Sequence, residues 1–168
     1  MSDTHETSRT RTITWEDPSS GAKLGQTMSG LEYLRAIQAG KVPPPPIAVL
    51  MGMWIAELSE GHVVFAAEPS EYHYNPIGTV HGGLAATLLD SALGCAIHST
   101  LPAGTGYSTL QLNINYLRPI TDKTGVVYST GNVIQVGGRV ATAEGRLTDA
   151  DGKLYAHATT TCIILRPM

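Results

Sequence analysis

The longest near-continuous run of apolar residues extends from Leu84 to Ile97, and most of its residues favour a helix. At about 100° per residue, large aliphatic side chains cover most of this helix, while one narrow stripe carries small or polar residues. The stripe consists of Thr87, Asp90, Ser91, Gly94 and His98. A helix this apolar is expected to be buried over most of its surface. The stripe therefore faces either solvent, which would make Asp90 an ordinary surface acid, or a cleft that a second subunit helps to close.

A shorter helix is predicted earlier in the chain, from Ser29 to about Ala39. Ser29 and Glu32 have the spacing of a capping box, and Gly40 ends the helical pattern. The prolines from Pro43 to Pro46 predict an extended connector. The apolar residues from Ile47 to Met51 predict a short turn that packs onto the core.

Alternating segments bounded by turn residues predict up to six strands. Their ranges are Trp54–Leu58, His62–Pro69, Tyr107–Leu117, Gly125–Val136, Arg139–Asp149 and Lys153–Leu165. The third alternates strictly, with Leu110, Leu112, Ile114 and Tyr116 on one face and Thr109, Gln111, Asn113 and Asn115 on the other. The first two strands form a hairpin and the last four a meander, so the sheet is expected to be antiparallel.

One long helix on an antiparallel sheet of five or six strands is an α+β arrangement. The 168 residues are enough for one domain, which we assign to residues 27–168, with the Ser29 helix as an extra N-terminal element. Residues 1–26 are polar and lack the hydrophobic core of a signal peptide. We expect them to form a flexible tail that is disordered or loosely docked.

The composition argues against several classes of function. With 11 basic and 14 acidic side chains and no basic cluster, the chain has no footprint for nucleic acid. No apolar run approaches the ~20 residues that span a bilayer, and the six histidines are too scattered to predict a metal site. Cys95 and Cys162 lie in apolar segments and predict reduced core thiols. A cytoplasmic enzyme is the expectation.

The start of the long helix is a candidate for chemistry, because Gly82 and Gly83 follow His81 there. The first turn of a helix exposes unpaired N–H groups at the positive end of the macrodipole. Glycines leave these groups uncovered, so they could bind a developing oxyanion. The alternative is a tight joint that simply requires glycine. The presence of Asp90 in the middle of this apolar helix also needs an explanation, since Asp is a poor mid-helix residue and is rarely buried unpaired.

Asn75, the His81-Gly82-Gly83 triplet and Asp90, followed by the strand from Ser108 to Ile120, resemble the hotdog-fold thioesterases of the PaaI type. The asparagine lies six residues before the histidine, and the acid lies nine residues after it. The resemblance extends from about Ile47 to Leu165. It implies a sheet wrapped around a central helix and the hydrolysis of an acyl-coenzyme A thioester, with no cofactor beyond the coenzyme A of the substrate.

The resemblance assigns catalytic roles to five residues. Asp90 is the general base or the nucleophile, the Gly82 amide binds the thioester oxygen, and Asn75 orients the water or the carbonyl. The Thr109 hydroxyl assists the acid, although an ordinary sheet threonine is the alternative. His81 shapes the turn and polarises the substrate, or it is only a helix-capping histidine bonded to the backbone.

The start of the long helix and weaker matches at two strand ends supply candidates for substrate binding. They are Gly83, Arg118, Val136, Gly137, Gly138 and Arg139. The two arginines are candidates for the phosphates of coenzyme A, and the glycines of the hairpin let a ligand approach the backbone. Either arginine could instead be a solvated surface charge, and for Arg118 this alternative is favoured.

Two other functions remain open on the same fold. A non-catalytic acyl-CoA-binding or regulatory protein would not need Asp90. A dehydratase would need an Asp/His pair placed to remove and return a proton, and the sequence has no second acid near His81. The resemblance also implies a site shared between two subunits. We therefore expect a homodimer or a dimer of dimers, in which the edge of the strand from Tyr107 to Leu117 is covered.

Overall fold

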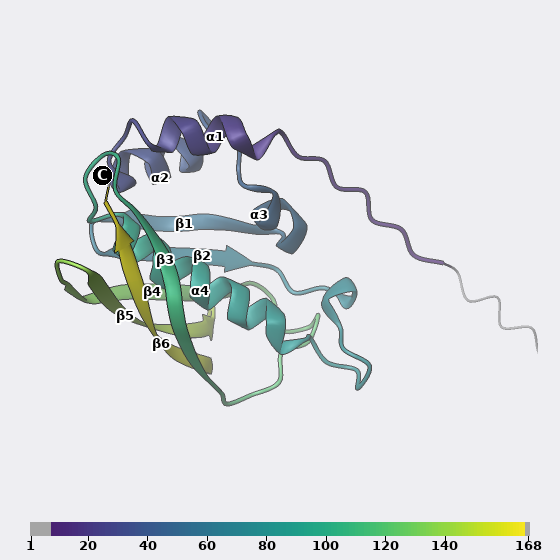
Figure 1. The fold of residues 1–168 in the computed structure, drawn as a ribbon. Coiled ribbons are helices and arrows are strands. Elements are labelled where there is room, and N and C mark those ends of the chain that lie inside the picture. Colours follow the sequence, from purple (N-terminus) through teal and green to yellow (C-terminus); the bar gives the residue numbers. More distant parts are fainter. Residues whose placement is uncertain (1–7, 167–168) are drawn as a thin grey trace, which may run out of the picture.

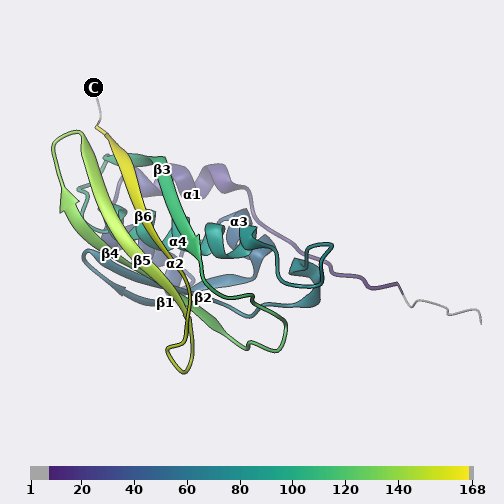
Figure 2. The ribbon, with the colours of Figure 1, turned by 90° about the horizontal axis from the view of Figure 1, so that it is seen from below.

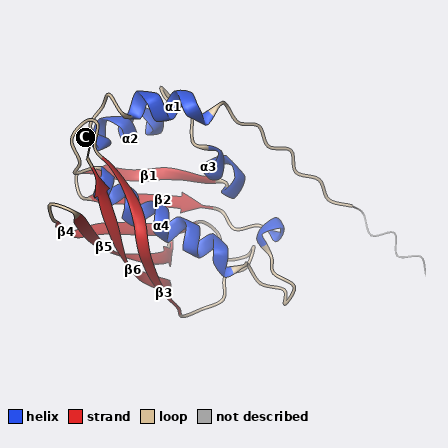
Figure 3. Ribbon diagram, in the orientation of Figure 1, coloured by secondary structure: helices blue, strands red, loops and turns tan. Residues whose placement is uncertain are grey.

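The computed structural model describes residues 8–166 as a six-stranded antiparallel sheet with four α-helices (Figure 1 and Figure 3). The helices are α1 (Pro18–Gly25), α2 (Gly30–Gln38), α3 (Pro46–Met51) and α4 (Gly82–His98), with a short 3-10 helix at Glu71–His73. The strands are β1 (Met53–Ser59), β2 (His62–Ala67), β3 (Gly106–Tyr116), β4 (Val127–Val136), β5 (Val140–Asp149) and β6 (Leu154–Leu165). The α+β hotdog architecture with a central long helix is confirmed.

Helix α4 lies across one face of the sheet, which curves around it (Figure 1 and Figure 2). Its fully buried aliphatic side chains are Leu84, Leu88, Leu89, Leu93 and Ile97. Two glycines of the sheet permit the close approach. A Cβ on Gly131 would lie 2.4 Å from the Ala92 carbonyl oxygen, and one on Gly145 would lie 2.5 Å from Leu93 Cδ1. The central helix is therefore the core of the subunit.

The order of strands in the sheet is β1-β2-β4-β5-β6-β3, so the predicted meander of four consecutive strands is wrong. Strand β3 pairs with β6, and β4 pairs with β2. The physical reason is the crossover: α4 carries the chain from β2 across the face of the sheet, and β3 starts on its far side (Figure 1). Of the last four strands, only β4, β5 and β6 follow one another as hairpins. As a result, β3 is an edge strand.

The strict alternation predicted along β3 is also wrong. The register of β3 against β6 shifts between Thr109 and Gln111, which leaves Leu110 as a bulge. A bulged residue changes which face the following residues present. Leu110 is 60% exposed, whereas Leu112 and Ile114 pack against the core. Thr109 thus leaves the outer face predicted for it and faces α4.

The N-terminal elements differ in part from the prediction. Helix α2 has the expected capping box, in which Ser29 Oγ accepts from the Glu32 amide and the Glu32 carboxylate accepts from the Ser29 amide. Residues 46–51 form α3 in place of a turn, because Pro46 fits the first helical position. Within the predicted tail, residues 18–25 form α1, which Asp17 caps. Residues 1–7 of that tail lie outside the described residues.

Candidate active site

Asp90 and Thr109 meet between α4 and β3. The Thr109 hydroxyl donates a hydrogen bond of 2.9 Å to Asp90 Oδ1, and both residues are half-buried. The contact depends on the bulge at Leu110, since regular alternation from Gln111 would turn Thr109 away from the helix. Among the described residues, Asp90 Oδ2 has no hydrogen-bond partner. One carboxylate oxygen is therefore held in place and the other is available.

A cavity of about 660 Å³ lies beside Asp90. Ser91, Cys95 and His98 of α4 line it together with Tyr107 of β3. Of the two alternatives for the polar stripe, solvent or a cleft, Asp90, Ser91 and His98 thus face a cleft. The two other stripe residues do not line it: the Thr87 hydroxyl donates to the Gly83 carbonyl, and Gly94 is covered by the Tyr107 ring.

Among the described residues that line the cavity, Asp90 is the only acid, and its titratable neighbours are neutral near neutral pH. Burial raises the pKa of the Cys95 thiol to about 12, and the charge of Asp90 adds to this effect. Burial also raises the pKa of Tyr107 well above 10 and lowers the pKa of His98 below 6.5. The thiol, the phenol and the imidazole are thus neutral. Among the described residues of the cavity wall, the Asp90 carboxyl group is therefore the candidate for base or nucleophile chemistry.

The start of α4 forms a second, smaller site. His81 caps the helix, and its Nδ1 accepts from the Gly83 amide at 2.8 Å, so this amide is not free for a ligand. The Gly82 amide has no acceptor among the described residues. Gly82 lines a cavity of about 360 Å³ together with His81, Tyr116 and Arg118. The helix-capping role of His81 is therefore present, and one amide remains available to an anion.

Asn75 holds the loop before α4. Its Oδ1 accepts from the amides of Ile77 and Thr79, and its Nδ2 donates to Thr79 Oγ1. The side chain that the sequence assigned to orienting water or carbonyl is thus used within its own turn. It lines neither of the two cavities.

Within one subunit the two sites are separate. Gly82 and Asp90 are eight residues apart on α4, which corresponds to ~12 Å along the axis at ~1.5 Å per residue. The amides of the first turn also point away from the helix body, in the direction opposite to Asp90. A single thioester carbonyl cannot reach both groups of the same subunit.

The remaining candidates lie at strand ends. Arg118 is exposed, and its guanidinium donates to the Leu154 carbonyl. It also lines the cavity at Gly82, so it lies beside a candidate site. The hairpin residues Val136, Gly138 and Arg139 are exposed, and Gly137 is half-buried. These four hairpin residues line neither of the two cavities.

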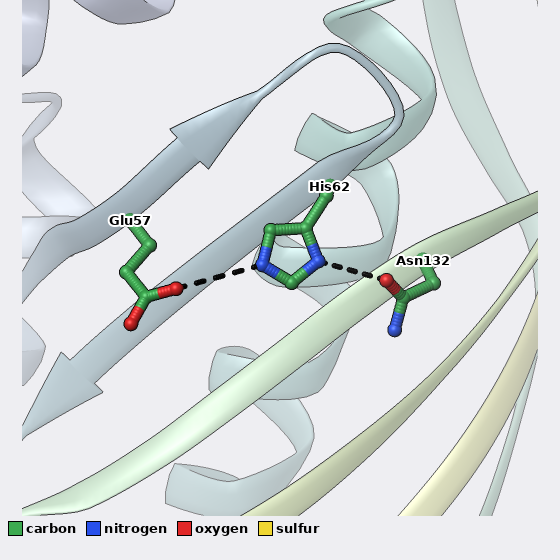
Figure 4. A network of polar contacts seen from close by, with 3 residues as sticks. All are labelled: Glu57, His62 and Asn132. Atoms are coloured by element: carbon green, nitrogen blue, oxygen red, sulfur yellow. Dashed lines mark hydrogen bonds and ion pairs between the residues drawn. The ribbon is translucent and has the colours of Figure 1, made fainter.

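His62 of β2 joins three neighbouring strands through contacts to Glu57 of β1 and Asn132 of β4 (Figure 4). Its Nδ1 lies 2.8 Å from Asn132 Oδ1, and its Nε2 lies 3.7 Å from Glu57 Oε2. No nucleophile belongs to this cluster, and its residues line neither cavity described above. It is a polar contact on the surface of the sheet.

In the described part of the chain, no group of three or more His, Cys, Asp or Glu side chains is arranged to hold a metal ion. Among residues 8–166, no helix combines the length and the apolar character needed to cross a bilayer.

Known proteins resemble this chain in sequence and in fold. Residues 77–156 match the model of the Thioesterase superfamily. Over 114 residues the chain is 34% identical to acyl-coenzyme A thioesterase 13 of Homo sapiens, and the match covers 67% of this chain and 80% of the human protein. A stretch of 69 residues is 44% identical to an esterase candidate of Halobacterium salinarum and covers 40% of this chain and 44% of that protein.

Among solved structures, a phenylacetic acid degradation-related protein of Ralstonia eutropha superposes with a TM-score of 0.71 at 31% identity. The superposition covers 78% of this chain and 98% of that protein. The chain therefore belongs to the thioesterase superfamily, as a hotdog-fold thioesterase of the PaaI type.

Proposed function

We propose that the protein hydrolyses an acyl-coenzyme A thioester to the free acid and coenzyme A, with Asp90 driving the attack on the carbonyl. The observation that carries this proposal is the Asp90 carboxylate, which the Thr109 hydroxyl holds at the wall of a largely apolar cavity. The human relative, named as an acyl-coenzyme A thioesterase, supports the choice of substrate.

Two chemical routes are compatible with this arrangement. As a general base, Asp90 takes a proton from a water molecule whose oxygen attacks the thioester carbonyl. The C–S bond then breaks, and the coenzyme A sulfur leaves and takes up the proton. As a nucleophile, the carboxylate attacks the carbonyl itself, the C–S bond breaks and the coenzyme A thiolate leaves, which forms a mixed anhydride. Water then opens the anhydride to the free acid and the Asp90 carboxylate, and its proton goes to the thiolate. In both routes the Thr109 hydrogen bond fixes the reacting carboxylate.

The oxyanion donor comes from a second subunit in this proposal. The Gly82 amide is free but lies ~12 Å along the helix axis from Asp90 of the same chain. A two-fold dimer could place the start of one α4 opposite Asp90 of the other. The edge strand β3 offers an unpaired ladder for such a dimer, next to the Asp90–Thr109 pair.

The arginines complete the proposal on the coenzyme A side. Arg118 lines the same cavity as Gly82 and is one candidate for a phosphate of coenzyme A. Arg139, exposed after the glycines of the β4–β5 hairpin, is the second candidate for a phosphate.

The test is the release of free thiol from acyl-CoA esters by wild type and by Asp90→Asn. The variant keeps the size of the side chain and removes its charge, and loss of a positioned acid or base typically costs ~10²–10⁴-fold in rate. Asp151→Asn, an exposed acid in the β5–β6 turn, is the matched control and should retain wild-type turnover.

Thermal melts should show that both variants fold. If folded Asp90→Asn hydrolyses the esters within about threefold of wild type, far inside the range expected for a lost base, Asp90 is not catalytic. A non-catalytic acyl-CoA-binding protein would then be the better description.

A further inference from the structure

Two groups of structural elements form the walls of the cavity beside Asp90. Its inner wall is formed by Tyr107 and by four residues of α4: Asp90, Ser91, Cys95 and His98. Its outer wall comes from α2, the proline connector, α3 and the first hairpin (Figure 1). The outer residues are Tyr33, Leu34, Ile37, Gln38, Pro44, Pro45, Ile47, Ala48, Met53, Trp54, Ile55 and Phe65. The superfamily match begins at residue 77, so all of these residues lie outside it.

The outer wall is anchored firmly to the rest of the fold. The Gly30 amide donates to the Leu101 carbonyl at 3.0 Å, and a Cβ on Gly30 would lie 1.8 Å from the His98 carbonyl oxygen. The backbone of α2 therefore touches the end of α4. Helix α3 is held at its C-terminal end, where the Arg11 guanidinium donates to the carbonyls of Leu50 and Val49. The wall is a fixed part of the subunit.

The chemistry of the lining selects against charge. Within residues 8–166, no Lys, Arg or Glu lines the cavity, and Asp90 is the single acid there. An acyl group that ends in a carboxylate would be buried without a counter-charge and close to a like charge, which is unfavourable. Aliphatic side chains and the rings of Tyr33, Trp54 and Phe65 instead offer apolar contact.

The size of the cavity also argues against the smallest acyl groups. At about 660 Å³, it falls within the range of small-molecule sites, ~300–1,000 Å³. An acetyl group has about the bulk of two water molecules, at ~30 Å³ each. It would leave most of the cavity unfilled.

We propose that this cavity holds the acyl group of the substrate, and that the preferred group is uncharged, apolar and considerably larger than acetyl. The outer wall, with Ile37 of α2 at its surface, sets the upper limit of size. The inference rests on the proposed function, because it takes Asp90 as the residue beside the thioester carbonyl. It assigns substrate selection to the N-terminal elements of this chain.

The first measurement is kcat/KM for acetyl-, hexanoyl-, decanoyl- and succinyl-CoA. Burial of each further methylene should raise kcat/KM about fourfold until the cavity is full. Succinyl-CoA should be a poorer substrate than hexanoyl-CoA. Equal use of succinyl- and hexanoyl-CoA, or a preference for acetyl-CoA, would overturn the proposal.

The second measurement places the acyl group in the cavity. Ile37→Trp adds bulk to the outer wall, and Leu50→Trp adds it to α3 at an exposed residue that does not line the cavity. Ile37→Trp should lower kcat/KM for decanoyl-CoA at least tenfold, the loss of about two buried methylenes, and should leave acetyl-CoA nearly unchanged. Leu50→Trp should leave both unchanged. An equal effect of the two variants, or no effect of either, contradicts the assignment.

A binding experiment separates this inference from the proposed function. S-decyl-CoA and S-ethyl-CoA are thioethers that cannot be hydrolysed, so calorimetry reports their binding even if no turnover is found. Wild type should bind the decyl compound more tightly, and Ile37→Trp should remove most of that preference. Loss of turnover with retained preference refutes only the proposed function, whereas equal binding of the two thioethers refutes the acyl site.

Discussion

At the scale of single residues, the surroundings of Asp90 remove competing charge from its cavity. Cys95 and Tyr107, which could each become anionic, are held neutral by burial, and His98 is held neutral by the same cause. The thiol of Cys95 is therefore an apolar wall group and a poor nucleophile at neutral pH. Asp90 can act without a second anion beside it.

The neutral thiol predicts a pH dependence of stability. The pKa of Cys95 rises from 9.0 to about 12 on folding, so its contribution to stability is fully present below pH 9 and is lost as the pH rises toward 12. In that window the unfolded chain releases a proton that the folded chain keeps, and stability falls by at most about 1.4 kcal/mol per pH unit. Cys95→Ala removes this pH-dependent contribution of the thiol to the free energy of unfolding.

Urea unfolding of wild type and Cys95→Ala at pH 8 and pH 10 measures the effect. The difference in free energy of unfolding between the two proteins should shift with pH in favour of the variant. Every other titrating group is common to both proteins. A difference that does not change with pH would mean that the folded protein ionises Cys95 as readily as the unfolded chain does.

The sequence singled out Asp90 and Thr109 as a candidate pair, but not the way in which they meet. Thr109 was expected on the polar face of a regular strand, and only the bulge at Leu110 turns it toward Asp90. A bulge leaves little trace in an alternating pattern, because Leu110 looks like one more apolar position. For Asn75, the sequence suggested a contact with the substrate, but the side-chain amide bonds within its own turn, which the sequence could not show.

At the scale of elements, the position of α4 depends on its close approach to β4 and β5. Gly131 and Gly145 leave room for the helix backbone and for Leu93. The position of the helix sets that of Asp90 against Thr109. Packing between helix and sheet therefore controls the geometry of the candidate site.

Gly131→Ala tests this control. The added Cβ would lie 2.4 Å from the Ala92 carbonyl oxygen, so the helix must move or the sheet must bend. Overpacking of this kind costs about 1–3 kcal/mol, and we expect a loss of that size in the free energy of unfolding. Gly106→Ala is the control, because its Cβ would meet only Leu165, at 3.9 Å. Equal denaturant midpoints for the two variants would show that α4 tolerates displacement.

Most elements were predictable because their patterns are local. The capping box of α2, the apolar run of α4 and the turns between β4, β5 and β6 are all present in short stretches of sequence. The pairing of β3 with β6 is not local, since it joins residues about 50 positions apart across a crossover. The outer wall of the cavity escaped prediction for the same reason: nothing within α2 or α3 shows that they face the stripe of α4.

At the scale of the whole molecule, one subunit holds two halves of a candidate site that cannot act on the same carbonyl. Asp90 lies in the middle of α4, and the free Gly82 amide lies ~12 Å away along the axis at its start. Edge strand β3 carries Thr109 and is the natural surface for a second copy. A two-fold dimer would contain two complete sites, each with its acid from one subunit and its amide from the other.

This arrangement predicts complementation between two inactive variants. Gly82→Pro removes the amide donor but suits the first position of a helix. His81, with ψ at 135°, already has the backbone conformation required before proline. Loss of one oxyanion donor costs ~10²–10³-fold, so both the Gly82→Pro and the Asp90→Asn homodimers should be nearly inactive. A heterodimer of the two variants contains one site with both Asp90 and the Gly82 amide.

The heterodimer can be isolated by co-expression with two different affinity tags and assayed for thiol release. It should recover about half of the wild-type turnover per dimer, because one of the two shared sites is intact. If each site lay within a single subunit, every subunit of the heterodimer would carry a lesion, and its activity would stay at the level of the parents. Thermal melts of both homodimers test whether the variants fold. For Gly82→Pro, they test whether the Tyr116 ring, 3.2 Å from a Cβ at residue 82, accommodates proline. A folded but inactive heterodimer would contradict the shared site.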